Sequence, residues 1–208
     1  MLRSHILLFF FPFFISGIIQ QVNAQTLSQP GWFSLGARST LSAFSHDGNG
    51  LGAGGQFRIR FSNQVNSDWF ADYISISTDD GIKSIYYHIG WSVLYYPVKD
   101  SDHPQLIQPY ILAGHCFDYN EKSQISLPSN KLSRWGSAVQ TGLGLHFNLS
   151  PAFDISVMSQ YMIHLTKEIE GERENDGVYV FKKHQERGLE GHLLNTISVN
   201  YKLFRLWK

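Results

Sequence analysis

The chain has 208 residues, of which 43% are hydrophobic and 14% aromatic, and its 17 basic and 17 acidic side chains balance. This composition excludes an intrinsically disordered chain, and a near-neutral protein lacks the basic face that nucleic-acid binding requires. A single cysteine, Cys116, cannot form an internal disulfide, so a disulfide-stapled scaffold is excluded as well. We expect Cys116 to be a small, half-buried filler residue in a strand rather than a reactive thiol.

The first 24 residues have the three parts of a secretory signal peptide. Arg3 precedes an apolar run over residues 6–15, and the small-residue cleavage pattern Val22-Asn23-Ala24 follows. The apolar run is too short for a membrane-spanning helix, which needs about 20 residues. We therefore expect residues 1–24 to be a signal peptide and residues 25–208 to form one exported domain.

From Trp32 onward, apolar and polar residues alternate with a period of two, most clearly over residues 153–165. This period is typical of strands with one apolar face, and a helix would scatter the same residues around its circumference. Turn signals divide the chain into eight segments. The expected strands are 32–43, 51–61, 69–78, 83–96, 106–119, 134–148, 153–166 and 192–204.

The predicted connections form two groups. Those after odd-numbered strands are residues 45–50, 79–82, 120–133 and 167–191, and they carry Asp-Gly, Asn-Gly and clusters of charge. Those after even-numbered strands are residues 62–68, 97–105 and 149–152. An even strand number puts both termini on one side, so this grouping is typical of an outer-membrane barrel with periplasmic termini and external loops.

The polarity of the two strand faces separates a membrane barrel from a soluble ligand carrier, which would have an apolar interior and a charged outer face. Gly142 and Gly144 share one face with Gln140, opposite Leu143 and Leu145. Small and polar residues suit a narrow, filled lumen, whereas large apolar residues suit lipid. We therefore predict an all-β, eight-stranded, antiparallel, up-and-down transmembrane β-barrel, with the soluble carrier as the alternative.

Aromatic residues also gather at the expected periplasmic strand ends, as in an aromatic girdle at the lipid headgroups. The predicted girdle consists of Trp32, Phe61, Trp69, Tyr95, Tyr96, Tyr110, Phe147, Phe153, Tyr201 and Phe204.

Three segments carry a family resemblance. They are the strand opening Gln108–Gly114, the strand and tight turn Thr141–Pro151, and the strand Phe153–Tyr161. With the signal peptide, they resemble the small OmpA-like or porin-like outer-membrane β-barrel proteins of Gram-negative bacteria. The resemblance implies a monomer in the cell outer membrane, with outer-membrane lipids and the barrel assembly machinery as partners. Such barrels usually end their last strand on an aromatic residue, whereas here Lys208 follows Trp207.

Several charged residues fall on the inward face, where pairing across strands is expected because an unpaired charge in a narrow lumen is costly. They are Arg38, Arg58, Arg60, Lys202, Asp72, Asp118 and Asp154. Such pairs would plug the barrel, so we expect no open pore, with a narrow channel as the alternative.

The histidines show no recognisable metal-ligand spacing. Those of the exported domain are His46, His88, His103, His115, His146, His164, His184 and His192. A lipid-modifying enzyme would need a histidine beside a serine near the outer lipid interface, for which His115 and Ser159 are candidates without a supporting motif. We therefore predict no catalytic residue, no metal site and no cofactor.

The charged segment Lys167–Gly191 is expected to be an external hairpin around Val178–Phe181. External loops carry recognition in such barrels, so this segment is the candidate surface for an extracellular partner. The predicted function is structural or surface-interacting and non-enzymatic.

Overall fold

The computed structural model describes residues 30–45, 48–78, 81–98, 105–166, 169–174, 178–183 and 191–207. The predicted signal peptide and the side chains of His46, His103 and His184 lie outside these ranges. No helix in the described part of the chain has the length and hydrophobicity to span a membrane.

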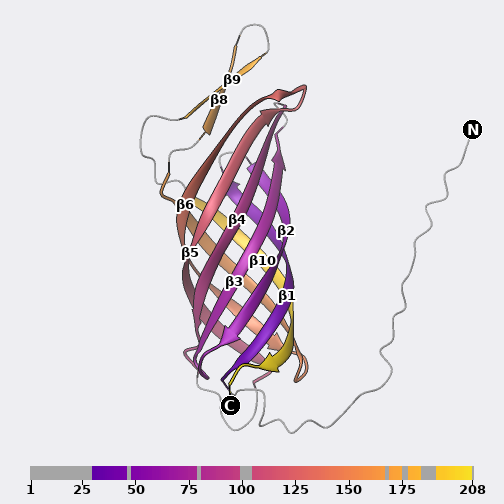
Figure 1. Cartoon of the computed structure of the whole chain (residues 1–208), viewed down its shortest axis with the longest axis vertical. Helices are drawn as coiled ribbons and strands as arrows, with labels where there is room; N and C mark the ends of the chain where they lie inside the picture. The colour runs from indigo at the N-terminus through magenta and orange to yellow at the C-terminus, as the bar shows by residue number, and fades with distance from the viewer. Residues whose placement is uncertain are drawn as a thin grey trace, which may run out of the picture.

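The described part of the chain consists mainly of β-strands. They are β1 (Trp32–Ser45), β2 (Gly48–Arg60), β3 (Val65–Ser77), β4 (Ile82–Tyr95), β5 (Ile107–Gln124), β6 (Leu127–Asn148), β7 (Phe153–His164), β8 (Ile169–Arg173), β9 (Tyr179–Lys183) and β10 (Gly191–Arg205). Eight of them close into a barrel in the order β1-β10-β7-β6-β5-β4-β3-β2, while β8 and β9 form a separate two-stranded sheet (Figure 1). Every neighbouring pair in the barrel is antiparallel, which confirms the predicted fold.

The strand register fixes the stagger of the barrel. If the paired residues are followed from Leu35 of β1 through β2 and each next strand around the barrel, the path ends at Gly191 of β10. The residue of β10 that pairs directly with Leu35 is Tyr201, which is ten positions from Gly191. A stagger of ten over eight strands tilts them by about 40° from the barrel axis, given about 3.3 Å per residue and about 4.7 Å between strands. This is the tilt of outer-membrane barrels.

Two glycines at the end far from the termini have backbone conformations typical of turns. Gly48 and Gly81 have φ of +96° and +85°, a left-handed conformation that favours glycine. Trp32 pairs with Arg205, so the two ends of the described barrel lie together, at the end marked C in Figure 1. In barrels of this class that end is periplasmic. We call it the terminal end, and the opposite end the hairpin end.

Several sequence-based strand boundaries were wrong, most clearly in two places. Residues 120–133, expected as a loop, continue β5 and β6 as a long hairpin that turns at residues 125–126. The third strand begins at Val65 rather than at residue 69, which brings Asp68 into the barrel wall. In both places polar residues on both faces hid the strand, because alternation is visible only where one face is apolar.

Candidate functional site: the filled lumen and the external hairpins

The outer face of the barrel is apolar. Leu143, Ile89 and Ile197 are more than half exposed, and the predicted outward residues of β4, from Tyr87 to Tyr95, alternate with buried ones. In water this face would aggregate, whereas in lipid it is solvated by acyl chains. The soluble carrier alternative is therefore excluded by the polarity of the wall.

Aromatic rings mark both edges of this apolar band. Near the hairpin end, neighbouring rings of Tyr73, Tyr87, Tyr119 and Trp135 lie 5.2, 5.8 and 5.2 Å apart on adjacent strands. We call these four residues the outer aromatic row. On β4, Tyr87 and Tyr95 are eight positions apart, which corresponds to about 20 Å along the barrel axis at the tilt given above. On β6, the twelve positions from Trp135 to Phe147 correspond to about 30 Å. These spans bracket the apolar band of about 25 Å in outer-membrane barrels.

The predicted girdle at the terminal end was right only for residues of outward parity. The ring centroids of Phe153 and Tyr201 lie 5.0 Å apart, and Phe61 stacks on Trp207 at 6.2 Å. By contrast, Tyr96 and Tyr110 are 1% and 2% exposed and lie inside the lumen. Trp32 also lines an internal cavity at that end. The prediction counted these three aromatics without regard to the face on which they lie.

The lumen near the terminal end is closed by a buried ion-pair network centred on Arg58. Its Nε donates to Asp68 Oδ1 at 3.0 Å, and its Nη1 donates to Asp154 Oδ1 at 3.2 Å. Asp68 lies on the neighbouring β3 and Asp154 on β7, three strands away around the barrel, so the network crosses the lumen. The expectation that inward charges pair across strands thus holds for Arg58 and Asp154, and Asp68 is a partner that sequence reasoning missed.

Neutral polar side chains extend this network. Asn200 Nδ2 donates to Asp154 Oδ1 at 2.8 Å, and Gln56 Nε2 donates to Asn200 Oδ1 at 2.5 Å. On the other side, Tyr96 Oη and His146 Nε2 are hydrogen-bonded at 2.7 Å. The adjoining cavity, lined among others by Arg58 and Lys202, has a volume of about 20 Å³, which is room for about one water molecule.

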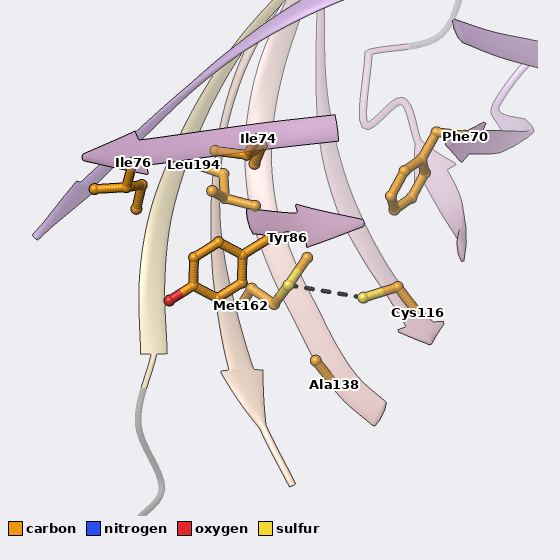
Figure 2. Close-up of a cluster of buried hydrophobic side chains, with 8 residues drawn as sticks. All are labelled: Phe70, Ile74, Ile76, Tyr86, Cys116, Ala138, Met162 and Leu194. Carbon is orange, nitrogen blue, oxygen red and sulfur yellow. Dashed lines mark hydrogen bonds between the residues drawn. The ribbon is translucent and has the colours of Figure 1, made fainter. Parts of the chain in front are cut away.

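Apolar side chains fill the lumen between the polar layers. Figure 2 shows one cluster, with Phe70, Ile74, Ile76, Tyr86, Cys116, Ala138, Met162 and Leu194 pointing toward one another from several strands. Cys116 Sγ contacts Met162 Sδ at 3.7 Å, and Cys116 is fully buried rather than half-buried as predicted. A second cluster toward the terminal end contains Leu94, Tyr96, Tyr110, Leu112 and Met158. The lumen is thus packed like a core.

A second buried ion pair lies beside the apolar cluster. Arg38 Nε is 3.0 Å from Asp72 Oδ1, and both side chains are almost fully buried. The Arg38 guanidinium also lies over the ring of Phe70, 4.4 Å from its centroid, an arrangement that favours a cation in a desolvated site. Here too the predicted inward charges are paired.

Three histidines line the lumen toward the hairpin end. His164 Nδ1 is 3.2 Å from Asp118 Oδ2, and the His164 ring lies 4.7 Å from His192 and 6.3 Å from His88. Both ring nitrogens of His88 lack a hydrogen-bond partner within the described ranges. No group of three or more His, Cys, Asp or Glu side chains in the described part of the chain is arranged to hold a metal ion.

The two candidate residues for a lipid-modifying enzyme are not brought together. His115 lies on the outer face of β5, edge-on to Phe117 at 5.1 Å. It pairs with Val139 of β6, which in turn pairs with Ile163 of β7, so Ile163 marks the level of His115 on β7. Ser159 is four positions from that level and two strands away. Such a separation does not allow the serine–histidine contact that nucleophilic catalysis needs.

Glycines on the inward face make room for the lumen side chains. A Cβ on Gly144 would meet the ring of Tyr110, and one on Gly54 would meet the carboxylate of Asp72. Their inward parity, predicted from the sequence, therefore reflects close packing across neighbouring strands.

Two hairpins project from the hairpin end. The β5–β6 hairpin extends beyond the barrel wall, and β8–β9, which belongs to the segment expected as an external hairpin, packs on its inner side. Asn130 Nδ2 of β6 donates to the carbonyl of Tyr179 at 2.6 Å, and the Tyr179 N–H donates to Gln124 Oε1 at 3.2 Å. Ile169 of β8 is fully buried. The two hairpins therefore form one layered projection.

The barrel wall, its tilt and its apolar outer band define a transmembrane β-barrel of the outer-membrane type. No protein-family model matches the chain, and no curated protein matches it either. Among solved structures, that of Neisserial surface protein A (NspA) is similar, with a TM-score of 0.60, 15% identity, and coverage of 83% of this chain and 97% of that one.

Two further solved structures share the fold. A major outer membrane protein from Thermus thermophilus has a TM-score of 0.54 at 11% identity, covering 83% of this chain and 98% of that one. The N-terminal β-barrel domain of Pseudomonas aeruginosa OprF has a TM-score of 0.51 at 11% identity, covering 84% of this chain and 98% of that one. The chain is a small eight-stranded outer-membrane β-barrel that resembles these proteins in fold, and its location is the cell outer membrane.

Proposed function

We propose that the protein is a non-enzymatic surface-interaction barrel, with a lumen closed to solutes and an external projection that binds a partner outside the cell. The observation that carries this proposal is the buried Arg58–Asp68–Asp154 network, which spans the lumen between strands on different sides of the barrel. A barrel sealed in this way serves as a rigid support for what it displays.

The channel alternative is disfavoured by the cost of opening. A permeating ion would have to displace Arg58 from two carboxylates and also pass the apolar cluster around Met162. Breaking a buried ion pair leaves uncompensated charge and costs about 3–5 kcal/mol. The enzyme alternative is disfavoured because His115 and Ser159 lie on different strands at different levels of the outer face.

The external projection supplies the binding surface. It rises beyond the outer aromatic row, so its side chains lie in water rather than in lipid. It carries charges of both signs, among them the pair Lys131–Glu121, in which Glu121 is half-buried, and the exposed pair Lys182–Glu172. An exposed pair such as Lys182–Glu172 contributes little stability, so a partner can replace that contact at little cost.

Planar-bilayer recording tests the closed lumen. The folded full-length protein is expected to give no stable conductance steps under conditions in which a large porin conducts. Reproducible steps that scale with the amount of protein would overturn the closed-lumen part of the proposal.

Cysteine labelling on intact cells tests which end faces outward. In a Cys116→Ala background, Ser129→Cys in β6 is expected to react with a membrane-impermeant maleimide, whereas Ser150→Cys, in the turn before β7, is not. The opposite pattern would place the projection in the periplasm. Retention of cells on immobilised extracellular glycoproteins then tests binding, with residues 121–133 replaced by a two-residue turn as the matched variant. Equal retention of both strains would contradict the binding role.

A further inference from the structure

A layer of buried charged and histidine side chains crosses the lumen toward the hairpin end. Five of its positions form one row of paired residues on the consecutive strands β1 to β5. They are Arg38, Gly54, Asp72, His88 and Asp118. Arg134 of β6, His164 of β7 and His192 of β10 complete the layer, and each of its side chains is at most 7% exposed. We call these residues the histidine layer, which receives a residue from every strand of the barrel.

The three histidines of this layer lie close to one another. The ring centroids of His164 and His192 are 4.7 Å apart, and those of His164 and His88 are 6.3 Å apart. Tyr86, from the apolar cluster, packs against them, with its ring centroid 5.6 Å from that of His192 and 6.2 Å from that of His88. Positive charges on these imidazoles would therefore repel one another at short range in a site of low dielectric constant.

The permanent charges of the histidine layer balance one another. Arg38 Nε is 3.0 Å from Asp72 Oδ1, which commits one carboxylate to one guanidinium. Asp118 Oδ2 is 3.2 Å from His164 Nδ1, and Asp118 also interacts electrostatically with Arg134. Among the described residues of the layer, two guanidinium groups thus face two carboxylates while the histidines are neutral. Each proton added to a histidine gives the layer one excess positive charge.

The histidine layer lies on the external side of the lumen. Tyr87, a member of the outer aromatic row, directly precedes His88 in β4. Tyr119 of the same row directly follows Asp118 in β5. The next inward charge of β5 toward the hairpin end, that of Lys122, is positive as well. Because the opposite end of such a barrel is periplasmic, the pH that acts on the layer is that of the medium outside the cell.

We infer that the histidine layer is an acid-sensitive lock, which holds the outer half of the lumen closed at neutral pH and loosens when the external medium is acidified to about pH 5. The inference goes beyond the proposed function, which concerns the barrel closed at neutral pH. Asp118 can compensate a proton on His164, whereas both ring nitrogens of His88 lack a hydrogen-bond partner within the described ranges. His88 is therefore the residue on which acid acts most strongly.

The direction of the effect follows from proton linkage. A histidine in water has a pKa of about 6.5, so a solvated His88 in an opened layer is protonated at about pH 5. If the closed layer keeps His88 neutral, the ratio of closed to open molecules falls about thirtyfold between neutral pH and about pH 5. If His88 takes the proton inside the closed layer, an uncompensated charge is buried there. In both cases acid favours the open layer, so the stability that the layer provides is present above about pH 6.5 and is lost as the pH falls below that value.

The test uses the cysteine of the chain as a probe of the layer. Cys116 is fully buried, two positions from Asp118 in β5, and belongs with Tyr86 to the apolar cluster of Figure 2. The full-length protein, folded in phospholipid vesicles, is treated with the disulfide reagent 4,4′-dithiodipyridine at about pH 7.5 and at about pH 5. Each rate is divided by that of the urea-unfolded protein at the same pH, which removes the pH dependence of the thiol itself. His88→Phe keeps a ring that cannot take a proton, and His146→Gln is the matched control, which removes an inward histidine at the terminal end. Heat-modifiable gel migration verifies that each variant is folded.

The lock predicts that the normalised rate of Cys116 in the wild type rises about tenfold or more from neutral pH to about pH 5. His88→Phe should reduce this rise to less than about threefold, whereas His146→Gln should retain it. An unchanged wild-type rate at acid pH would overturn the inference without recourse to any variant. So would a rise in His88→Phe equal to that of the wild type, or loss of the rise in His146→Gln, because the acid-sensitive group would then lie elsewhere. In each case, the conductance and cell-retention results at neutral pH would still decide the proposed function separately.

Discussion

Removing the charge of Arg58 should destabilise the barrel more than removing the charge of a solvent-exposed ion pair. In Arg58→Met, Asp68 and Asp154 keep their positions at 4% and 2% exposure but lose the cation that donates to both. Two buried carboxylates without a cation cost about 3–5 kcal/mol, which lowers the folded-to-unfolded ratio roughly a thousandfold. Replacing all three groups, as Arg58→Met with Asp68→Asn and Asp154→Asn, should recover most of that loss, because no charge then remains unpaired.

The measurement is equilibrium unfolding in urea of protein folded into phospholipid vesicles, followed by tryptophan fluorescence and by the heat-modifiable gel band. Lys182→Met is the control, since the Lys182 side chain is 63% exposed in its pair with Glu172 and should change stability by about 0–1 kcal/mol. If Arg58→Met stayed within about 1 kcal/mol of the wild type, the network would not be the structural closure described here. A triple variant less stable than the single one would refute the charge argument specifically.

Other consequences of the wall and the packed lumen can be measured in the same way. Leu143→Arg places a charge on the lipid face and should cost about 2–4 kcal/mol near the midplane, whereas Gln140→Ala on the lumen face should cost less; equal costs in vesicle unfolding would contradict the assigned polarity. Gly144→Val should destabilise by about 1–3 kcal/mol because its side chain meets the Tyr110 ring, and Tyr110→Ala should relieve part of that loss in the double variant. Cys116 should resist maleimide in the folded barrel and react fully in urea; rapid reaction in the folded state would show that the lumen admits small solutes.

Much of the wall was predictable because the membrane itself enforces alternation. Between the aromatic edges, one strand face meets lipid and the other meets the lumen, so Leu143 and Gln140 reveal their faces by parity alone. Beyond the outer aromatic row both faces meet water. There Glu121 and Lys131 look like loop residues, although they lie in the longest strands of the protein. The alternation of apolar and polar residues is lost where both strand faces meet the same solvent.

The inward charges were predictable as a set, but their pairing was not. Parity assigned Arg58 and Asp154 to the lumen, yet their contact depends on the ten-residue stagger, which is a property of the closed barrel and not of any single strand. Asp68 was missed for a local reason. It follows Asn66 and Ser67, which resemble a turn in composition, although β3 already begins at Val65.

The closing pair β1–β10 also sets the order in which this protein can become complete. Thr40 Oγ1 and Thr196 Oγ1 are hydrogen-bonded at 3.0 Å although 156 positions separate them in the chain. Apart from the pair β7–β10, the other neighbouring strands of the barrel follow one another in the chain and can pair locally and early. The closing pair β1–β10 instead requires the last strand to reach the first. Until then, β1 has one row of unpaired peptide groups, which hydrocarbon cannot satisfy. Insertion and closure are therefore one concerted event, and a chain shortened by its final strand should accumulate outside the bilayer instead of forming a seven-stranded barrel.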